Sequence, residues 1–224
     1  MIVLGFDTAT AATAVALLDG DAAGSAAQRR HDPAPGIRPG HASLLLALAH
    51  ELLAGAGLTF AGVDRIAVGL GPGGFTGLRI GVATARALAQ AADAEIVGVS
   101  TLRTLAMAAR PAPGQNVLAV VDARRGEVFA GGWRDGEQLL GPLAVAPAAV
   151  GELGVEGWLA VGDGALRFRE DLEGAGCVVP QDHSPQHAVS AQMTCRLALA
   201  ARHGTPLDLV VPDYLRKPDA KPRP

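Results

Sequence analysis

The chain of 224 residues has few cysteines, few aromatic side chains and no long apolar run, and each shortage excludes a class of protein. The spacing of Cys177 and Cys195 matches neither a disulfide framework nor a metal-binding motif, so we expect two small buried residues in a reducing compartment. No apolar run approaches the ~18 residues of a membrane span. Met1 to Phe6 lacks the basic start of a signal peptide, and Asp7 interrupts it, so we expect a cytoplasmic protein.

Lysine is also scarce, since seventeen of the nineteen basic residues are arginine. The net charge of −3 and the pI of about 6.0 argue against a protein that holds RNA by itself. Arg29, Arg30 and Arg38 could contact tRNA or lie in a solvated loop, and we expect the loop. A hydrophobic content of 49% supplies ample core for one large domain or two small lobes.

Glycine is plentiful, and the segment from Arg65 to Gly81 concentrates it. The apolar run Ile66 to Leu70 predicts a buried strand, and the glycines that follow it predict a sharp turn. A helical pattern then begins near Thr76. A strand, a glycine loop and a helix N-terminus together are typical of an anion-binding site.

Two familiar versions of such a loop fail on their residues. A Walker A loop ends in Gly-Lys-Ser/Thr, whereas Leu78 and Arg79 follow Gly77 here. A dinucleotide-binding loop needs an acidic residue at the end of the next strand, whereas Glu95 begins that strand. The glycines can therefore serve an anion, or they can serve only the turn and close helix packing.

The hydrophobic pattern predicts an α/β protein whose strands and helices are spread over the whole length. The expected strands are 2–6, 13–18, 24–30, 66–70, 95–99, 117–121, 128–133 and 158–161. The expected helices are 41–56, 76–92, 101–110 and 186–203. Proline and glycine at 111–114 predict a boundary between a lobe of residues 1–110 and a smaller lobe of residues 111–224. We expect the charged, proline-rich tail from Lys217 to be mobile.

Several motifs occur together and in a family's order. They are Leu4–Thr10, His41 with Leu45–Leu46, Gly71–Gly81, Gly98–Leu102, Val121–Val128 and Tyr214–Arg216. On these motifs the chain resembles the TsaB family, bacterial proteins needed to make threonylcarbamoyladenosine in tRNA. The string Gly71–Gly81 is specific for the family, whereas each of the other motifs is weak alone and supports the resemblance only in combination.

The resemblance implies a two-lobed fold of the sugar-kinase/Hsp70/actin type with mixed sheets flanked by helices. Members of the family resemble degenerate relatives of the catalytic subunit TsaD, which transfers the threonylcarbamoyl group. The resemblance therefore implies a scaffold or activator without catalytic residues of its own, and it implies no required cofactor. The implied partners are TsaD, the ATPase TsaE, a second copy of the chain when TsaD is absent, and tRNA only through the complex. The resemblance does not decide whether ATP binds at the interface of the complex.

The first turn sits where the superfamily places its first phosphate loop. Candidate nucleotide- or anion-binding residues there and in the glycine loop are Asp7, Thr8, Thr10, Gly71, Gly73 and Gly74. Ala9 replaces the glycine that would let backbone amides approach a phosphate. We therefore favour a self-capping turn, in which Asp7 bonds nearby amides, over nucleotide binding.

No metal site is expected. The segment Val99–Thr104 stands where catalytic relatives carry paired histidines, and it offers no metal ligand. His183 and His187 are four residues apart, but Pro185 between them predicts a loop, so we expect exposed loop histidines.

The expected helices 41–56 and 76–92 are the candidate partner surface. Leucines surround more than half of helix 41–56, whereas a single apolar stripe is enough to cover its own core. The candidate interface residues are His41, Leu45, Leu48, Leu52, Arg79, Val82 and Arg86. The alternative function is an active ATP-dependent phosphotransferase or carbamoyltransferase that uses the Asp7 and Gly71 loops. A homodimeric nucleotide sensor is a third reading.

Overall fold

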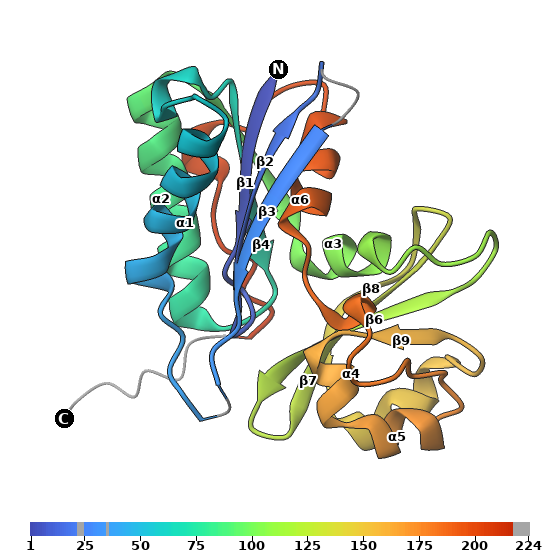
Figure 1. The fold of residues 1–224 in the computed structure, drawn as a ribbon. Helices are drawn as coiled ribbons and strands as arrows, with labels where there is room; N and C mark the ends of the chain where they lie inside the picture. Colours follow the sequence, from blue (N-terminus) through green and yellow to red (C-terminus); the bar gives the residue numbers. More distant parts are fainter. Residues whose placement is uncertain (22–24, 35, 217–224) are drawn as a thin grey trace.

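The computed structural model describes residues 1–21, 25–34 and 36–216 and has an α/β fold built around two sheets (Figure 1). The tail from Lys217 to Pro224, expected to be mobile, lies outside the described residues. The first sheet contains β1 (Ile2–Asp7), β2 (Thr13–Asp19), β3 (Ser25–His31), β4 (Arg65–Gly71) and β5 (Glu95–Ser100). The second contains β6 (Val117–Arg124), β7 (Glu127–Arg134), β8 (Glu137–Val145) and β9 (Leu159–Val161).

The first sheet is mixed and has the order β3-β2-β1-β4-β5. β1 pairs antiparallel with β2 and parallel with β4, so the expected three-strand opening is confirmed. α1 (His41–Gly55) and α2 (Phe75–Ala92) cover one face, and α6 (Ala191–Leu199) covers the other (Figure 1).

Alternate residues of β1 supply the two faces of this sheet, as the period of a strand requires. Leu4 and Phe6 join the core beneath α1 and α2, whereas Val3 joins the core beneath α6. The core beneath α6 is lined largely by alanines and by Cys195, which lets this short helix lie close to the strands.

The second sheet has the order β8-β7-β6-β9, with β6 and β9 parallel and the other pairs antiparallel. α3 (Thr101–Ala108) packs on one face, and α4 (Asp163–Arg167) and α5 (Arg169–Gly174) lie on the other (Figure 1). Short 3-10 helices complete the described chain at Phe60–Gly62, Pro147–Leu153, Pro185–His187 and Leu207–Leu209.

The last α-helix begins later than the sequence predicted. Residues 185–187 form a 3-10 turn, and α6 starts at Ala191, where the Ser190 hydroxyl accepts a hydrogen bond from the Met193 N–H. That serine is the stronger start signal, because its side chain satisfies one of the free amides of the first turn.

A buried arginine ties α6 back to the first sheet. The Arg65 guanidinium pairs with Glu95 and donates to the carbonyl oxygens of Ala198 at 2.7 Å and Ala201 at 3.0 Å. These acceptors stand at the C-terminal end of α6, where a cation is favourable. Residues from beyond 110 thus pack against the first sheet. We call each sheet with the helices packed on it a lobe, and the division of the chain at residue 110 stays a prediction.

Two parts of the second half were missed or shortened by the sequence analysis. β8 was not predicted, because its residues are largely exposed and show no clean alternation. α4 and α5 were not predicted, because they are short and their pattern is weak. Among the described residues no helix is both long and apolar enough to cross a membrane.

Candidate functional site

A cleft of about 430 Å³ opens between the turn after β1, the N-terminus of α2 and the edge of the second sheet. Its first wall comes from Thr8–Ala11, Arg38–Pro39, His41, Gly74–Gly77 and Ile80. Its second wall comes from Asp122, Arg124 and Asp163. The cleft is the place to test the candidate residues of the phosphate-loop position.

Asp7 ends β1 and lies behind the cleft rather than in its lining. Its Oδ1 accepts a hydrogen bond from the Ala9 N–H at 2.8 Å, and its Oδ2 accepts one from the Thr101 hydroxyl at 2.7 Å. The same hydroxyl accepts from the Gly71 N–H at 3.2 Å. Burial raises the pKa of the Asp7 carboxyl despite these hydrogen bonds. The self-capping turn expected at Asp7 is confirmed.

Thr8 and His41 join the turn to the helices on its flank. The Thr8 hydroxyl donates to the Gly77 carbonyl oxygen at 2.8 Å, so it is already engaged within the protein. His41 Nδ1 lies 2.8 Å from the Thr13 hydroxyl, and burial lowers the pKa of this imidazole. Two polar side chains of the first wall, Thr8 and His41, are therefore already bonded within the protein.

The glycine loop packs directly on this turn. The Gly74 N–H donates to the Ala9 carbonyl oxygen at 2.7 Å. A Cβ at Gly73 would lie 2.3 Å from that same oxygen, and a Cβ at Gly77 would lie 2.0 Å from the Thr8 carbonyl oxygen. Since real Cβ atoms do not approach so closely, these glycines are required for packing, as one of the two sequence interpretations held.

The second wall carries two adjacent carboxylates. Asp163 Oδ1 accepts from the Asp122 N–H at 3.1 Å, and burial raises the pKa of the Asp163 carboxyl. Asp122 Oδ2 accepts from Arg167 at 2.9 Å and lies 3.3 Å from Arg124 Nη1. The acidic pair is thus offset by two arginines, and Gly162–Gly164 is a strand-to-helix turn that leads into α4.

The predicted nucleotide residues are divided by the structure. Thr8, Thr10 and Gly74 line the cleft, and Gly73 lines a neighbouring cavity. Asp7 and Gly71 lie behind and are linked through Thr101, a residue that sequence reasoning missed. The signal available for Thr101 was its place directly after β5, at the first turn of a helix capped by Ser100.

The partner-interface prediction needs a correction for four of its residues. His41, Leu45, Leu52 and Val82 are at most 4% exposed and belong to the interior of the first lobe. Leu48 is half-buried against the same core. The leucine-rich side of α1 packs on its own sheet, so Leu45 and Leu52 are not available to a partner.

The outward face of α1 and α2 is formed by other residues, and of the predicted interface residues it keeps Arg79 and Arg86. We define the partner face as the exposed residues of these two helices. In α1 they are Ala42, Ser43, Leu46, Ala47, His50, Glu51, Ala54 and Gly55. In α2 they are Thr76, Arg79, Ala83, Arg86, Ala87, Gln90 and Ala91.

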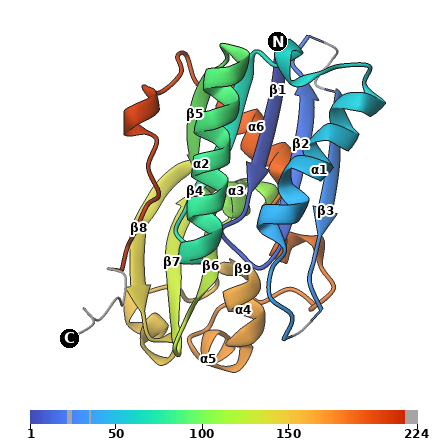
Figure 2. The ribbon, with the colours of Figure 1, turned by 90° about the vertical axis from the view of Figure 1, so that its left-hand side faces the viewer.

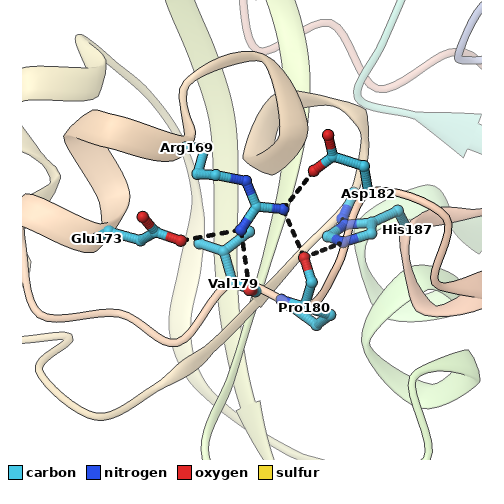
Figure 3. Close-up of polar contacts among 7 residues, drawn as sticks. Arg169, Glu173, Val179, Pro180, Asp182 and His187 are labelled. Atoms are coloured by element: carbon cyan, nitrogen blue, oxygen red, sulfur yellow. Dashed lines mark hydrogen bonds and ion pairs between the residues drawn. The ribbon is translucent and has the colours of Figure 1, made fainter.

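The two histidines at 183 and 187 do not behave alike. His183 is exposed as expected, but His187 is buried, which corrects the prediction. His187 Nδ1 accepts from the Gly162 N–H at 3.2 Å, and Nε2 lies 3.1 Å from the Pro180 carbonyl oxygen (Figure 3). A ring with its hydrogen on Nε2 and an acceptor at Nδ1 satisfies both contacts.

Arg169 holds the loop that follows α5 in place beside His187 (Figure 3). Its guanidinium donates to Glu173 at 2.9 Å, to the Val179 carbonyl oxygen at 3.0 Å and to Asp182 at 2.6 Å. Across the described residues, no group of three or more His, Cys, Asp or Glu side chains is placed to hold a metal ion.

The basic residues near the cleft have separate environments. Arg30 pairs with Asp32 at 2.7 Å and donates to the Val189 carbonyl oxygen at 2.7 Å. Arg29 and Arg30 lie on β3 rather than in the expected loop, and Arg29 is exposed. Arg38 is exposed in the loop before α1 and lines the cleft.

Comparison with known proteins gives concordant results. A family model described as TsaD, tRNA N6-adenosine threonylcarbamoyltransferase, matches residues 25–165. The tRNA threonylcarbamoyladenosine biosynthesis protein TsaB of Escherichia coli is 37% identical over 130 residues, which are 58% of this chain and 53% of that protein. An uncharacterised protein of Mycobacterium tuberculosis is 35% identical over 229 residues, covering 98% of this chain and 94% of its own length.

Solved structures agree over nearly the full length. YeaZ from Pseudomonas aeruginosa superimposes with a TM-score of 0.75 at 29% identity and covers 95% of this chain and 100% of its own. A ROK hexokinase from Thermus thermophilus, at 14% identity and a TM-score of 0.52, covers 89% of this chain and 100% of its own and shares the fold alone. The expected two-lobed, sugar-kinase-like α/β fold is confirmed, and the chain belongs to the TsaB/YeaZ family.

Proposed function

We propose that this protein is a non-catalytic subunit of a tRNA threonylcarbamoyladenosine-synthesising complex. Its partner is a TsaD-like catalytic subunit, and a TsaE-like ATPase joins through that subunit. The chain requires no cofactor of its own, contacts tRNA only within the complex, and pairs with a second copy of itself when the catalytic subunit is absent.

One observation carries the non-catalytic part of this proposal. The phosphate-loop position is filled by the protein itself, since Ala9 supplies a methyl group and a carbonyl oxygen that pack on Gly73 and bond Gly74. Asp7, the residue that would hold a metal-bound water, is 2% exposed and has both carboxylate oxygens bonded internally. A phosphate at this loop would have to displace backbone that is already hydrogen-bonded.

The partner face supports the interaction part. Alanine is its commonest residue, and it includes Leu46, which is 48% exposed. Small side chains let another helix approach closely, and a pair of such helices from each protein could bury an interface of roughly 1,600 Å². Glu51, Arg79 and Arg86 would then contribute charged contacts at the rim.

A drop-out reconstitution tests the proposal as a whole. A TsaD-like subunit, a TsaE-like ATPase, a threonylcarbamoyl-adenylate synthase, ATP, threonine, bicarbonate and unmodified tRNA are combined with and without this chain. Mass spectrometry then counts the modified adenosine. We expect product only when the chain is present, and no product when it meets tRNA and preformed adenylate alone. Product or ATP consumption without the TsaD-like subunit would overturn the non-catalytic assignment.

Surface variants test the partner face without touching the core. Leu46→Asp and Ala83→Glu place charges on exposed positions of α1 and α2, whereas Ala112→Glu is a matched change on an exposed loop. We expect the first two to abolish co-purification with the TsaD-like subunit and the third to have no effect. Pairing that survives both helix variants would remove these helices from the interface.

A second candidate is an ATP-dependent phosphotransferase or carbamoyltransferase that acts in the cleft. The observation in its favour is the open space of about 430 Å³, with Thr8 and Thr10 on one wall and Asp163 on the other. ATP turnover by the pure chain that is lost in Asp7→Asn would favour this enzyme. Tight nucleotide binding without turnover, and independent of any TsaD-like subunit, would favour a homodimeric sensor instead.

A further inference from the structure

The C-terminal described segment crosses from one lobe to the other. Figure 2 shows it in red, passing from the side of the first sheet and α2 towards the strands β7 and β8 of the second sheet. Val210, just before this crossing, is fully buried in the core of the first lobe. We call residues 212–216 the strap.

The first-lobe end of the strap is fixed to the end of β4 and to α2. The Asp213 N–H donates to the Leu70 carbonyl oxygen at 2.8 Å. The Tyr214 ring packs on Phe75 with ring centroids 5.1 Å apart, and its hydroxyl accepts from Arg79 Nε at 3.1 Å. The Arg79 guanidinium itself lies 3.9 Å above the centre of the Phe75 ring, which is a favourable cation–π geometry.

The second-lobe end of the strap is fixed to the hairpin between β6 and β7. Arg216 Nη1 donates to the Glu127 carboxylate at 2.6 Å, and Nη2 donates to the Ala123 carbonyl oxygen at 3.0 Å. Leu215, between these anchors, packs against the core beneath α3. A single residue, Leu215, therefore separates an anchor on α2 from an anchor on the other sheet.

The space that the strap spans is not filled by direct packing of the lobes. A cavity of about 620 Å³ lies there, lined by Gly73, Gly74 and Phe75 on one side and by Ala123 to Arg125 and Phe129 on the other. On this side of the molecule the strap is a continuous stretch of chain that joins the two sides of this cavity.

The strap also borders the partner face. A groove of about 450 Å³ is lined by Arg79, Val82, Ala83 and Arg86 of α2 together with Pro212 and Tyr214 of the strap. Tyr214 is 38% exposed, so a protein docked on α2 would contact both the tyrosine and the arginine that holds it. The Tyr214 side chain is thus exposed to a docked protein on one side and anchors the strap to α2 on the other.

We propose that the strap is an inter-lobe latch through which the partner face and the second lobe are coupled. Arg216 and Tyr214 are its positioning residues: they hold the hairpin after β6 at a fixed distance from α2 and present Tyr214 to the partner. The coupling to a partner rests on the proposed function, whereas the latch itself concerns the isolated chain.

Arg216→Gln is the most direct test, because this residue lies at the end of the strap away from the partner face. Glu127→Gln removes the same ion pair from the other side, and Arg134→Gln is a matched change of an exposed second-lobe arginine. Spin labels at Thr59→Cys and Glu170→Cys, both exposed positions, report the distance between the lobes by double electron–electron resonance. Burial of Cys177 and Cys195 keeps the native thiols out of the labelling reaction.

We expect a narrow distance distribution in the otherwise unchanged chain and in Arg134→Gln, and a broader or shifted one in Arg216→Gln and Glu127→Gln. Far-UV circular dichroism confirms that each variant is folded. A distribution unchanged in both latch variants would overturn the latch.

A second arm measures binding to the TsaD-like subunit by titration. Arg216→Gln should weaken binding about fivefold, as expected for a modest coupling between sites, although the partner face is unaltered. Equal affinity of Arg216→Gln and Arg134→Gln would overturn the coupling. Absence of binding by the unaltered chain would instead overturn the proposed function, and the distance measurement would still decide whether the latch exists.

Discussion

Gly77 tests whether the glycines of the Gly71–Gly81 motif serve packing. A Cβ at this position would lie 2.0 Å from the Thr8 carbonyl oxygen, a backbone atom that cannot rotate away. Forcing such a contact costs about 3 kcal/mol, at the upper end of overpacking effects. The displaced turn also loses the hydrogen bond from the Thr8 hydroxyl to the Gly77 carbonyl, which contributes about 1 kcal/mol. Alanine in place of glycine stabilises a helix by about 1 kcal/mol, which offsets part of this loss.

Gly77→Ala should therefore lower the free energy of unfolding by about 3 kcal/mol, which corresponds to a fall in Tm of about 10 °C for a chain of this size. Gly55→Ala is the control, because a Cβ there has no atom within 4 Å and alanine should be neutral or slightly stabilising. Gly81→Ala should fall between the two, because its Cβ would meet Thr8 Oγ1 at 2.5 Å, and a side chain can turn about χ1 whereas a backbone carbonyl cannot.

Urea unfolding followed by far-UV circular dichroism measures all three variants, with equal slopes required for the comparison. If Gly77→Ala unfolds at the same urea concentration as Gly55→Ala, α2 does not dock closely on the turn after β1. The motif would then need another explanation, and an anion at the N-terminus of α2 would become the leading one.

Two further outcomes follow from buried groups, and a third follows from the hydrogen bonds of Arg169. The folded-state pKa of Asp7 is raised above the ordinary value of 3.8, so the native state binds its proton more readily. The unfolding free energy should fall as pH rises from 3.8 through the raised pKa, and Asp7→Asn should lack this fall in urea titrations across that range; parallel profiles would refute it. Burial raises the pKa of Cys177 to about 11 and of Cys195 to about 12, so neither thiol should react with Ellman's reagent at pH 8 until urea unfolds the protein. Arg169→Ala leaves two carbonyl oxygens of the following loop without this donor, so proteolysis near residues 179–182 should become faster; unchanged proteolysis would show that the loop does not depend on Arg169.

The first sheet and its helices were predictable because their signals are strong and local. The apolar runs at β1, β2 and β4 and the glycine stop after α1 place each element within one or two residues of its observed bounds. The second half was less predictable, since β8 is exposed on much of its length and α5 has six residues. The hydrophobic periodicity of such elements is weak, so they are hard to predict from the sequence.

The candidate site was partly predictable for a different reason. The position of the turn after β1 came from the motif, and so did its self-capping by Asp7. The pairing of Thr101 with Asp7 joins residues 94 positions apart, and no local pattern announces such a contact. The side of α1 that faces its own sheet could not be chosen either, because leucines on both sides of the helix fit the core equally well before the sheet is placed.

The docking of α6 on the first sheet has a consequence for the order in which the protein can fold on the ribosome. Val3, Ala14, Ala67 and Val97 reach the exit tunnel early, but the helix that covers them is made about a hundred residues after β5. During synthesis this apolar face stays open to water and to other nascent chains. We expect the first sheet to complete its folding only after α6 has been synthesised. A nascent chain stalled at residue 110 should therefore stay bound to chaperones. A chain stalled after α6 has emerged should be released from them.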